Sequence, residues 1–127
     1  LLNAKGLTTS AYPTATSPTA AEIAQVAERA RSADAVLVTT YTANTNSAQQ
    51  RLVQALLATG KPVAVASMRN PYDIAAFPAV DANILTYGNL DVSVRALARA
   101  LAGEVNPSGK LPVTIPGQYS FGHGLSY

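Results

Sequence analysis

The sequence predicts an α/β fold, in which an open and mostly parallel sheet carries helices on both faces as a three-layer αβα sandwich. Short apolar runs alternate with helical stretches along the 127 residues. Two of these runs, AVLVTTY at 35–41 and PVAVAS at 62–67, are continuous and rich in β-branched residues, which is typical of strands buried on both faces. Amphipathic helices separate the runs, as expected for βαβ units that fold into a single domain.

The N-terminal part of the chain predicts one weak strand and one helix. Leu1–Lys5 has the character of a last helical turn, which a glycine at position 6 ends. Leu7–Tyr12 is predicted as a weak strand, and a Thr/Pro/Ser loop follows it. Thr19 and Glu22 have the spacing of a capping box, which begins a helix. The apolar face of that helix consists of Ile23, Val26, Ala27 and Ala30.

The middle of the chain predicts a strand, a helix and a second strand. After the run at 35–41, Ser47 and Gln50 have the spacing of a second capping box. Gly60 ends the helix that follows, before the strand at 62–67. The apolar face of this helix consists of Leu52, Val53, Leu56 and Leu57.

The C-terminal part predicts a third strand, a helix and an edge strand. The third strand covers Asn83–Tyr87, and Asp91 is placed to cap the next helix, which ends at Gly103. Leu111–Ile115 is flanked by proline and is predicted as an edge strand. The apolar face of the helix consists of Val94, Leu97, Ala98 and Leu101.

The composition narrows the classes of function. With 48% apolar and 13% charged residues, the chain is too apolar for intrinsic disorder. No apolar run approaches the roughly 20 residues of a membrane span, and nine basic residues are spread singly, so neither a membrane nor a nucleic-acid partner is predicted. The chain contains no cysteine, which excludes thiol chemistry and disulfides. Its low charge indicates that part of the surface faces another domain.

Polar side chains follow each of the three buried strands. In an open α/β sheet the carboxyl ends of the strands form the edge where ligands bind, so these side chains are expected to lie together. Amide and guanidinium groups suit sugar hydroxyls or a neighbouring protein surface better than bond cleavage. The candidate residues for a substrate groove or a domain interface are Asn44, Asn46, Arg69, Asn70 and Asp73, with Asn89 on the same edge.

A purely structural role is the alternative for most of these residues. Asn and Asp are ordinary turn residues, and Asn46 and Asp91 also stand where helices begin. Arg69 directly follows an apolar strand and needs a partner. Two roles remain open for it: an internal ion pair with Asp73, or a position in a groove or interface.

The residues for a complete active site are not found in this sequence. The single histidine, His123, and the scattered acids offer neither a metal site nor a catalytic triad, and Ser67 lacks the Gly-x-Ser-x-Gly elbow. No glycine lies between Thr39 and Ser47, so a phosphate-binding fingerprint is absent. Of the seven acids, only Asp73 is placed in a cleft, whereas glycoside hydrolysis usually needs two carboxyl groups. We therefore expect no catalytic residue, no metal and no cofactor in this chain.

Two linked motifs at the C-terminus carry a resemblance to a known family. NPSGKLPVTIP at 106–116 and YSFGHGLSY at 119–127 closely resemble the end of the α/β sandwich domain of glycoside hydrolase family 3. GKPV at 60–63, the Asn70-Pro71 step and ARALAGEVN at 98–106 match in the same order. The resemblance covers essentially the whole chain and implies a flavodoxin-like sandwich over residues 1–127.

The resemblance implies a role in a longer enzyme. The loop after the run at 35–41 lacks the carboxylate that the β-glucosidase branch has there, so the chain is similar to the second domain of two-domain bacterial β-N-acetylglucosaminidases. In that branch a nucleophilic Asp and an Asp–His pair lie on an N-terminal (β/α)8 barrel. The implied parent is a retaining exo-glycosidase that releases terminal N-acetylglucosamine from cell-wall or chitin-type oligosaccharides. Its cellular location is left open, with secretion or cell-wall association favoured.

One departure from the family concerns the beginning of the domain. The family's sandwich normally starts with a further strand and helix, so the sequence is expected to lack the first strand of the sheet. We expect the isolated chain either to dimerise through this gap or to be marginally stable. Two other functions stay open: a stand-alone carbohydrate-binding or interaction module, and an inactive gene fragment.

Overall fold

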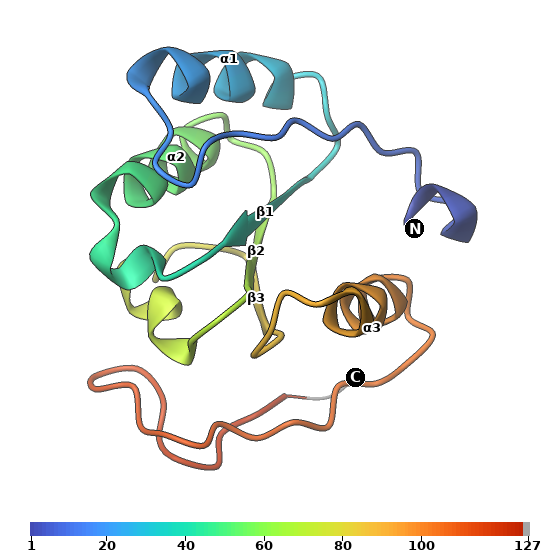
Figure 1. Cartoon of the computed structure of the whole chain (residues 1–127), viewed down its shortest axis with the longest axis vertical. Helices are drawn as coiled ribbons and strands as arrows, with labels where there is room; N and C mark the ends of the chain where they lie inside the picture. Colours follow the sequence, from blue (N-terminus) through green and yellow to red (C-terminus); the bar gives the residue numbers. More distant parts are fainter. Residues whose placement is uncertain (126–127) are drawn as a thin grey trace.

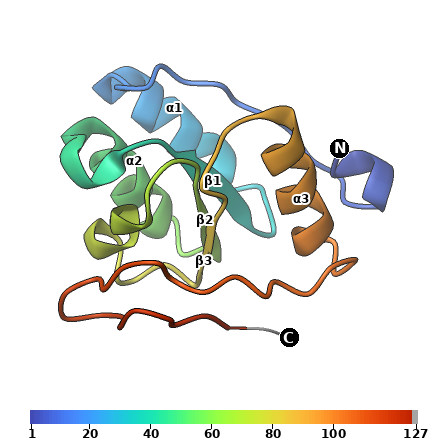
Figure 2. The same cartoon turned by 60° about the horizontal axis from the view of Figure 1, so that its bottom comes forward.

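The structure, a computed structural model, is an open parallel sheet between two helical layers, and it describes residues 1–125 (Figures 1 and 2). Ser126 and Tyr127, which end the second C-terminal motif, lie outside the described residues. Three short 3₁₀ helices are η1 (Asn3–Lys5), η2 (Ala43–Thr45) and η3 (Pro71–Ala76). The other elements are α1 (Ala20–Ala30), β1 (Val36–Thr40), α2 (Ser47–Leu57), β2 (Val63–Ser67), β3 (Ala82–Leu85) and α3 (Asp91–Leu101).

The sheet has the order β1-β2-β3, and both pairings are parallel. Alternate residues of β2 enter two different apolar clusters. Val63 and Val65 pack with residues of α1 and α2, whereas Ala66 packs with Leu97 of α3 on the opposite face. The predicted α/β class with helices on both faces is therefore confirmed.

β1 is an edge strand in the described part of the chain, and one of its two faces is exposed. The prediction that residues 35–41 are buried on both faces was therefore wrong. β1 pairs with β2 along its whole length. On its other side no strand of residues 1–125 is paired with it. Val38 and Thr40 are buried, but Leu37 is 36% exposed and Thr39 is exposed. An apolar run shows that a strand can be buried on both faces, but the described residues cover only one face of β1.

Two other predicted strands were also wrong. Leu7–Tyr12 lies as irregular chain across α1 and exposes Leu7 and Tyr12, because a strand needs a partner and none is paired with it in residues 1–125 (Figure 1). Leu111–Ile115 forms only an isolated bridge between Ile115 and Tyr119, since its prolines remove ladder donors. Residues 111–123, here called the C-terminal strap, instead run beyond β3 and cluster with Ile74 through Leu111 and Ile115.

Of the three predicted helix starts, the cap of α1 is confirmed, and the predicted caps of α2 and α3 were wrong. Thr19 and Glu22 form the predicted capping box, and hydrogen bonds from Thr19 lower the pKa of Glu22. The predicted box of Ser47 and Gln50 was wrong, because Gln50 donates instead to the carbonyls of Ala43 and Asn44.

The true N-cap of α2 is Asn46, whose side chain accepts from the amides of Ala48 and Gln49. Asp91 does not cap α3 either, since Leu90 occupies the N-cap position. The Asp91 carboxylate instead pairs with Arg95 at 2.6 Å, one turn along the helix, and raises the pKa of that guanidinium.

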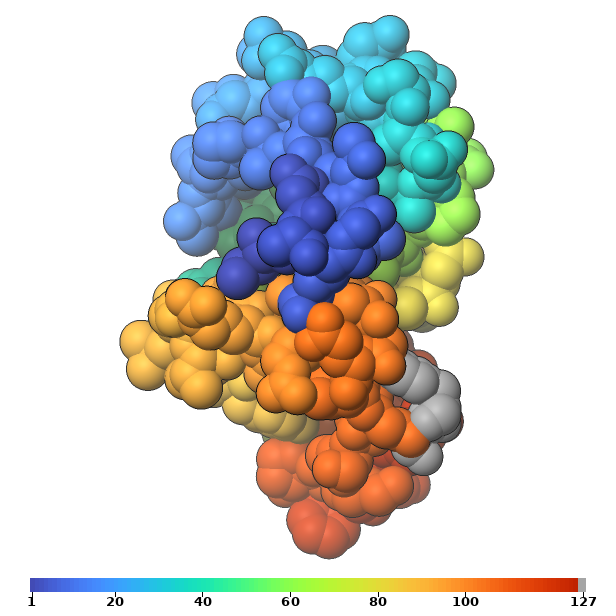
Figure 3. All heavy atoms as spheres, turned by 90° about the vertical axis from the view of Figure 1, so that its right-hand side faces the viewer, coloured from blue at the N-terminus to red at the C-terminus, as the bar shows by residue number. Residues whose placement is uncertain are grey.

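The N-terminal segment is joined to the end of α3. Lys5, the last residue of η1, forms an ion pair with Glu104, which lies three residues after α3. Figure 3 shows the two segments side by side on one face of the molecule. The hydrogen bond from Lys5 lowers the pKa of the Glu104 carboxyl, and Arg99 contributes to the lowering.

Candidate functional site

The loops that follow β1 and β2 meet at the carboxyl edge of the sheet. η2 follows β1, η3 follows β2, and the two short helices pack against each other. Both lie beyond the ends of the strands in Figure 1. The five candidate residues come from these two loops, so the parallel topology brings them together as predicted from the strand order.

Asp73 is fully buried beneath this edge. Its carboxylate accepts a hydrogen bond of 2.7 Å from Thr40 Oγ1, at the end of β1, and one of 3.2 Å from the backbone amide of Asn44. A buried carboxylate is stable only when such donors satisfy it. Asp73 therefore ties η3 to β1 and η2, and it holds the loops of the edge in place instead of facing a ligand.

Arg69 lies on the ring of Tyr41 and forms no ion pair with Asp73 within residues 1–125. Its guanidinium carbon is 5.2 Å from the ring centroid, and Nη1 donates to the Tyr41 hydroxyl at 3.2 Å. Gln49, which is buried, holds the Tyr41 backbone by one hydrogen bond to its amide and one to its carbonyl. Both side chains of the Arg69–Tyr41 pair are exposed, so the pair forms a fixed, solvent-facing platform.

The three asparagines differ in how far other hydrogen bonds already engage their side chains. Asn44 and Asn70 lie half-buried beside the platform, and Asn70 Nδ2 is 3.5 Å from Asn44 Oδ1. Asn70 also caps η3 by accepting from the amide of Tyr72 at 3.0 Å. Asn46 is wholly engaged, since its Oδ1 caps α2 and its Nδ2 donates to Ser17 Oγ at 2.9 Å. Asn46 thus begins α2, the structural role named for it as an alternative.

The sequence and the fold of the chain are similar to those of known proteins. Residues 4–127 match the profile described as the Glycosyl hydrolase family 3 C-terminal domain. The chain belongs to glycosyl hydrolase family 3. The family 3 domain is similar to a solved structure of a family 3 β-N-acetylglucosaminidase from Paenibacillus sp. str. FPU-7. The TM-score is 0.77 and the identity 33%, over 82% of this chain and 20% of that one.

A second relative carries a different substrate in its name. The family 3 domain is 37% identical over 83 residues to a putative beta-xylosidase of Formosa agariphila, a match that covers 61% of this chain and 11% of the relative. The family 3 domain thus spans a small part of both relatives. The predicted resemblance to the family is confirmed.

Sequence reasoning missed the three tyrosines of the edge. Tyr41, Tyr72 and Tyr87 follow β1, β2 and β3 respectively, and they are 39%, 40% and 48% exposed. The signal for them was present, because one tyrosine stands in each of the three strand-end loops. Exposed aromatic rings next to amides are a common surface for polar ligands that have an apolar face.

Backbone strain in the family 3 domain is concentrated at the same edge. Within residues 1–125, the non-glycine residues with positive φ are Thr42 at 58° and Tyr87 at 54°. The hydroxyl of Thr42 is buried without a hydrogen-bond partner. A β-branched residue rarely adopts this conformation, and strain of this kind is typical of functional loops. Each residue lies two positions beyond the end of a strand, Thr42 after β1 and Tyr87 after β3.

The guanidinium, amide and hydroxyl groups at the edge suit hydrogen bonding to a polar ligand. The connections after β1 and β2 contain two carboxylates: Asp73 is buried beneath the edge, and Asp81 directly precedes β3 and accepts from the amide of Val63, the first residue of β2. Retaining glycosidases need two carboxyl groups about 5 Å apart at the scissile bond.

Within residues 1–125 no group of three or more His, Asp or Glu residues is placed to hold a metal ion. In the same residues, no helix is long and apolar enough to cross a membrane.

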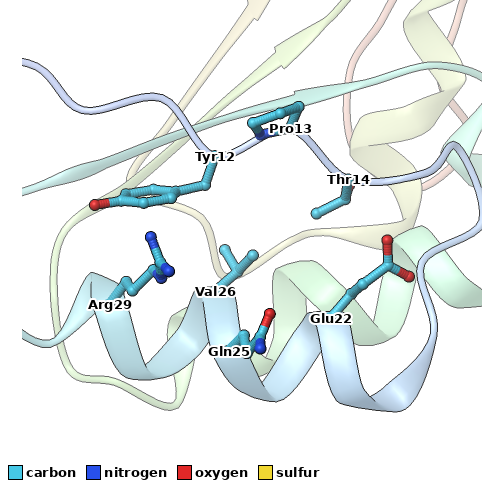
Figure 4. A pocket seen from close by; sticks show the side chains of 7 residues that line it. All are labelled: Tyr12, Pro13, Thr14, Glu22, Gln25, Val26 and Arg29. Atoms are coloured by element: carbon cyan, nitrogen blue, oxygen red, sulfur yellow. The ribbon is translucent and has the colours of Figure 1, made fainter.

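A separate hollow lies between the N-terminal segment and α1 (Figure 4). The Arg29 guanidinium carbon is 4.4 Å from the centroid of the Tyr12 ring, and Glu22, already engaged in its capping box, stands at the other end. None of the five candidate residues lines this hollow. Its lining consists of Tyr12, Pro13, Thr14, Glu22, Gln25, Val26 and Arg29.

Proposed function

We propose that the chain is the non-catalytic C-terminal domain of a retaining exo-β-N-acetylglucosaminidase. It packs on an N-terminal (β/α)8 barrel that contains the catalytic residues, and its carboxyl edge walls one side of the substrate groove. The observation that carries this proposal is the exposed Arg69–Tyr41 platform, with Asn44 and Asn70 beside it and the Asp73 carboxylate buried beneath them. Such a surface orients a sugar and excludes water without moving protons.

Family membership and the length of the relatives support a glycosidase parent, because the chain covers only 20% and 11% of theirs. N-acetylglucosamine as the substrate is favoured by the more extensive match, which covers 82% of this chain. The putative beta-xylosidase is matched over 61% and makes a xyloside the first alternative substrate. Assays with nitrophenyl glycosides of both sugars distinguish the two.

The second candidate function is a stand-alone carbohydrate-binding module. The exposed rings of Tyr41, Tyr72 and Tyr87 favour it, because sugar rings stack on aromatic faces. Calorimetric titration of the isolated chain with chito-oligosaccharides tests it. Binding with a stoichiometry near one supports a module, and no heat of binding leaves the edge as part of a larger groove.

The Arg69→Ala substitution in the complete enzyme tests the groove role of the edge. Loss of the guanidinium frees the Tyr41 ring and misplaces the substrate, so kcat/KM is expected to fall about tenfold, or ~1.4 kcal/mol. Arg31→Ala is the matched control, since Arg31 is an exposed arginine that pairs with Glu28 at the end of α1. Kinetics unchanged by Arg69→Ala would remove Arg69 from the site.

A further inference from the structure

The turn of the C-terminal strap carries a hollow that lies apart from the Arg69–Tyr41 platform. Its volume is about 250 Å³, slightly below the roughly 300 Å³ at which sites for drug-sized ligands begin, so it suits a ligand the size of one sugar ring. None of the five candidate residues lines it. Both views place the turn on the same side of the molecule as η3 (Figures 1 and 2). The lining consists of Thr114, Ile115, Gly117, Gln118, Tyr119 and Ser120.

A pair of stacked rings forms one wall of this hollow. The ring centroids of Tyr119 and His123 are 4.6 Å apart, and the two planes are inclined by 28°. Tyr119 lines the hollow and His123 does not, so the imidazole supports the phenol ring from outside the hollow. The backbone of His123 is fixed as well, since its carbonyl accepts from the amide of Leu111 at 2.8 Å. Tyr119 is 37% exposed, and a ring held by stacking loses little freedom when a ligand covers it.

The backbone of the turn keeps the hollow in shape. Residues 115–118 form a β-turn, in which the amide of Gln118 donates to the carbonyl of Ile115 at 3.1 Å. Gly117 has a φ of 76° and follows a proline, which is the combination typical of a type II turn. Ile115 is buried and clusters with Ile74 of η3. The hollow is therefore attached to the body of the fold.

The polar groups next to the ring are neutral. Gln118 and Ser120 are exposed and offer an amide and a hydroxyl group. In the described part of the chain no Asp, Glu, Lys, Arg or His side chain lines the hollow. An anionic ligand such as a phosphate would find no counter-charge here. A neutral pyranose ring fits better, because it presents an apolar face to an aromatic side chain and hydroxyl groups to neutral donors and acceptors.

We propose that this hollow binds one pyranose ring of a neutral oligosaccharide, with the apolar face of the sugar on the Tyr119 ring. The site goes beyond the proposed function, because it uses neither the Arg69–Tyr41 platform nor any catalytic group. It gives the domain a second contact with a long glycan. Gln118 Nε2 lies 3.5 Å from the carbonyl of Ala75, so the turn is attached to η3, which belongs to the carboxyl edge.

An NMR titration of the 127-residue chain with chitotetraose and with xylotetraose tests the proposal. His123 is the single histidine of the chain, so its ring signals report on the stack without ambiguity. We expect at least one of the two sugars to shift these signals saturably, and the sugar that does so identifies the ligand. Tyr119→Ala is expected to raise the Kd about fivefold or more, because the stacking surface is lost. Tyr12→Ala is the matched control, since Tyr12 is also exposed and stacks with Arg29 in the other hollow.

His123 signals that neither sugar shifts, or equal Kd values for Tyr119→Ala and Tyr12→Ala, would overturn the proposal. A Kd that rises in Tyr41→Ala instead would also overturn it, since the carboxyl edge would then be the site. Co-sedimentation of the complete protein with insoluble chitin and xylan repeats the comparison, and it decides the matter if the isolated chain does not fold. The bound fraction should fall in Tyr119→Ala, and an unchanged fraction contradicts the proposal. Hydrolysis enters none of these readouts, so their failure leaves the proposed function standing.

Discussion

At the scale of single residues, long-range contacts decide which candidates are exposed at the edge and which are buried. Thr19 and Glu22 are three positions apart, so their capping box could be predicted from spacing alone. The Arg69–Tyr41 platform joins residues 28 positions apart, and Asp73 reaches Thr40 across 33 positions. The strand order predicts that such residues share an edge. It does not predict which of them is buried, because that depends on the packing of η2 against η3.

The anchor role of Asp73 predicts a large loss of stability in Asp73→Ala. The substitution leaves the Thr40 hydroxyl and the Asn44 amide buried without an acceptor, so we expect the free energy of unfolding to fall by about 2–4 kcal/mol. Urea denaturation measures this, with the exposed Asp34→Ala as the control, expected within about 0.5 kcal/mol of wild type. Asp73→Asn keeps one acceptor and should lose less. A loss no greater in Asp73→Ala than in Asp34→Ala would contradict the role.

At the scale of elements, helices could be predicted more accurately than strands. The apolar periodicities of α1, α2 and α3 are local properties, and all three helices form where they were expected. Pairing is not local: 35–41 has the composition of a central strand but forms the edge strand β1, and 7–12 has strand composition but no partner in residues 1–125. At the start of α2 the sequence offered both Asn46 and Ser47 as caps, and the predicted Ser47–Gln50 box was wrong because Asn46 is the cap.

The competition at the start of α2 gives a test in two substitutions. Asn46→Ala removes the cap and the bond to Ser17, so we expect a loss of about 1–2 kcal/mol in the free energy of unfolding. Ser47→Ala should cost only a few tenths, because Ser47 Oγ accepts one exposed hydrogen bond from Arg51. Thermal or urea unfolding of both variants decides between the two caps. Equal losses would show that Ser47 takes part in capping.

At the scale of the whole molecule, an ion pair holds the N-terminal segment, buried apolar side chains hold the C-terminal strap, and one sheet edge is open. The ion pair of Lys5 and Glu104 joins η1 to the end of α3, and the C-terminal strap clusters with the fold through Leu111 and Ile115. β1 leaves the backbone groups of one side unpaired among residues 1–125. The two terminal contacts could not be predicted from sequence patterns, because they depend on which segments the fold places next to one another. A gap at the sheet edge was among the expectations drawn from the family resemblance.

The Lys5–Glu104 pair predicts a specific pH dependence of stability. The pKa of Glu104 is lowered in the folded chain from 4.5, so the stabilising contribution is present above pH 4.5 and is lost as the pH falls through the folded pKa. We expect Lys5→Met to be less stable than wild type at neutral pH, and the difference to shrink below pH 4.5. Arg99 keeps part of the lowering in the variant. Urea denaturation across this range measures it, and a difference that is constant with pH would contradict the account.

The open edge of β1 predicts association or marginal stability of the isolated chain. An unpaired edge with an exposed Leu37 is a template for another strand, and Leu37→Lys should reduce any association because edge charges oppose pairing. Sedimentation measures the association, and calorimetry measures the stability. A monodisperse monomer that melts cooperatively would rule this expectation out.

The central claim is that this domain recognises a glycan while the catalytic groups lie elsewhere in a longer polypeptide. The most direct measurement is the rate at which the complete product of the gene, and the 127-residue chain alone, release nitrophenol from nitrophenyl N-acetyl-β-glucosaminide. The account predicts turnover by the complete protein and none by the chain. Turnover by the chain alone, or none by a folded complete protein on this or any other nitrophenyl glycoside, would contradict it.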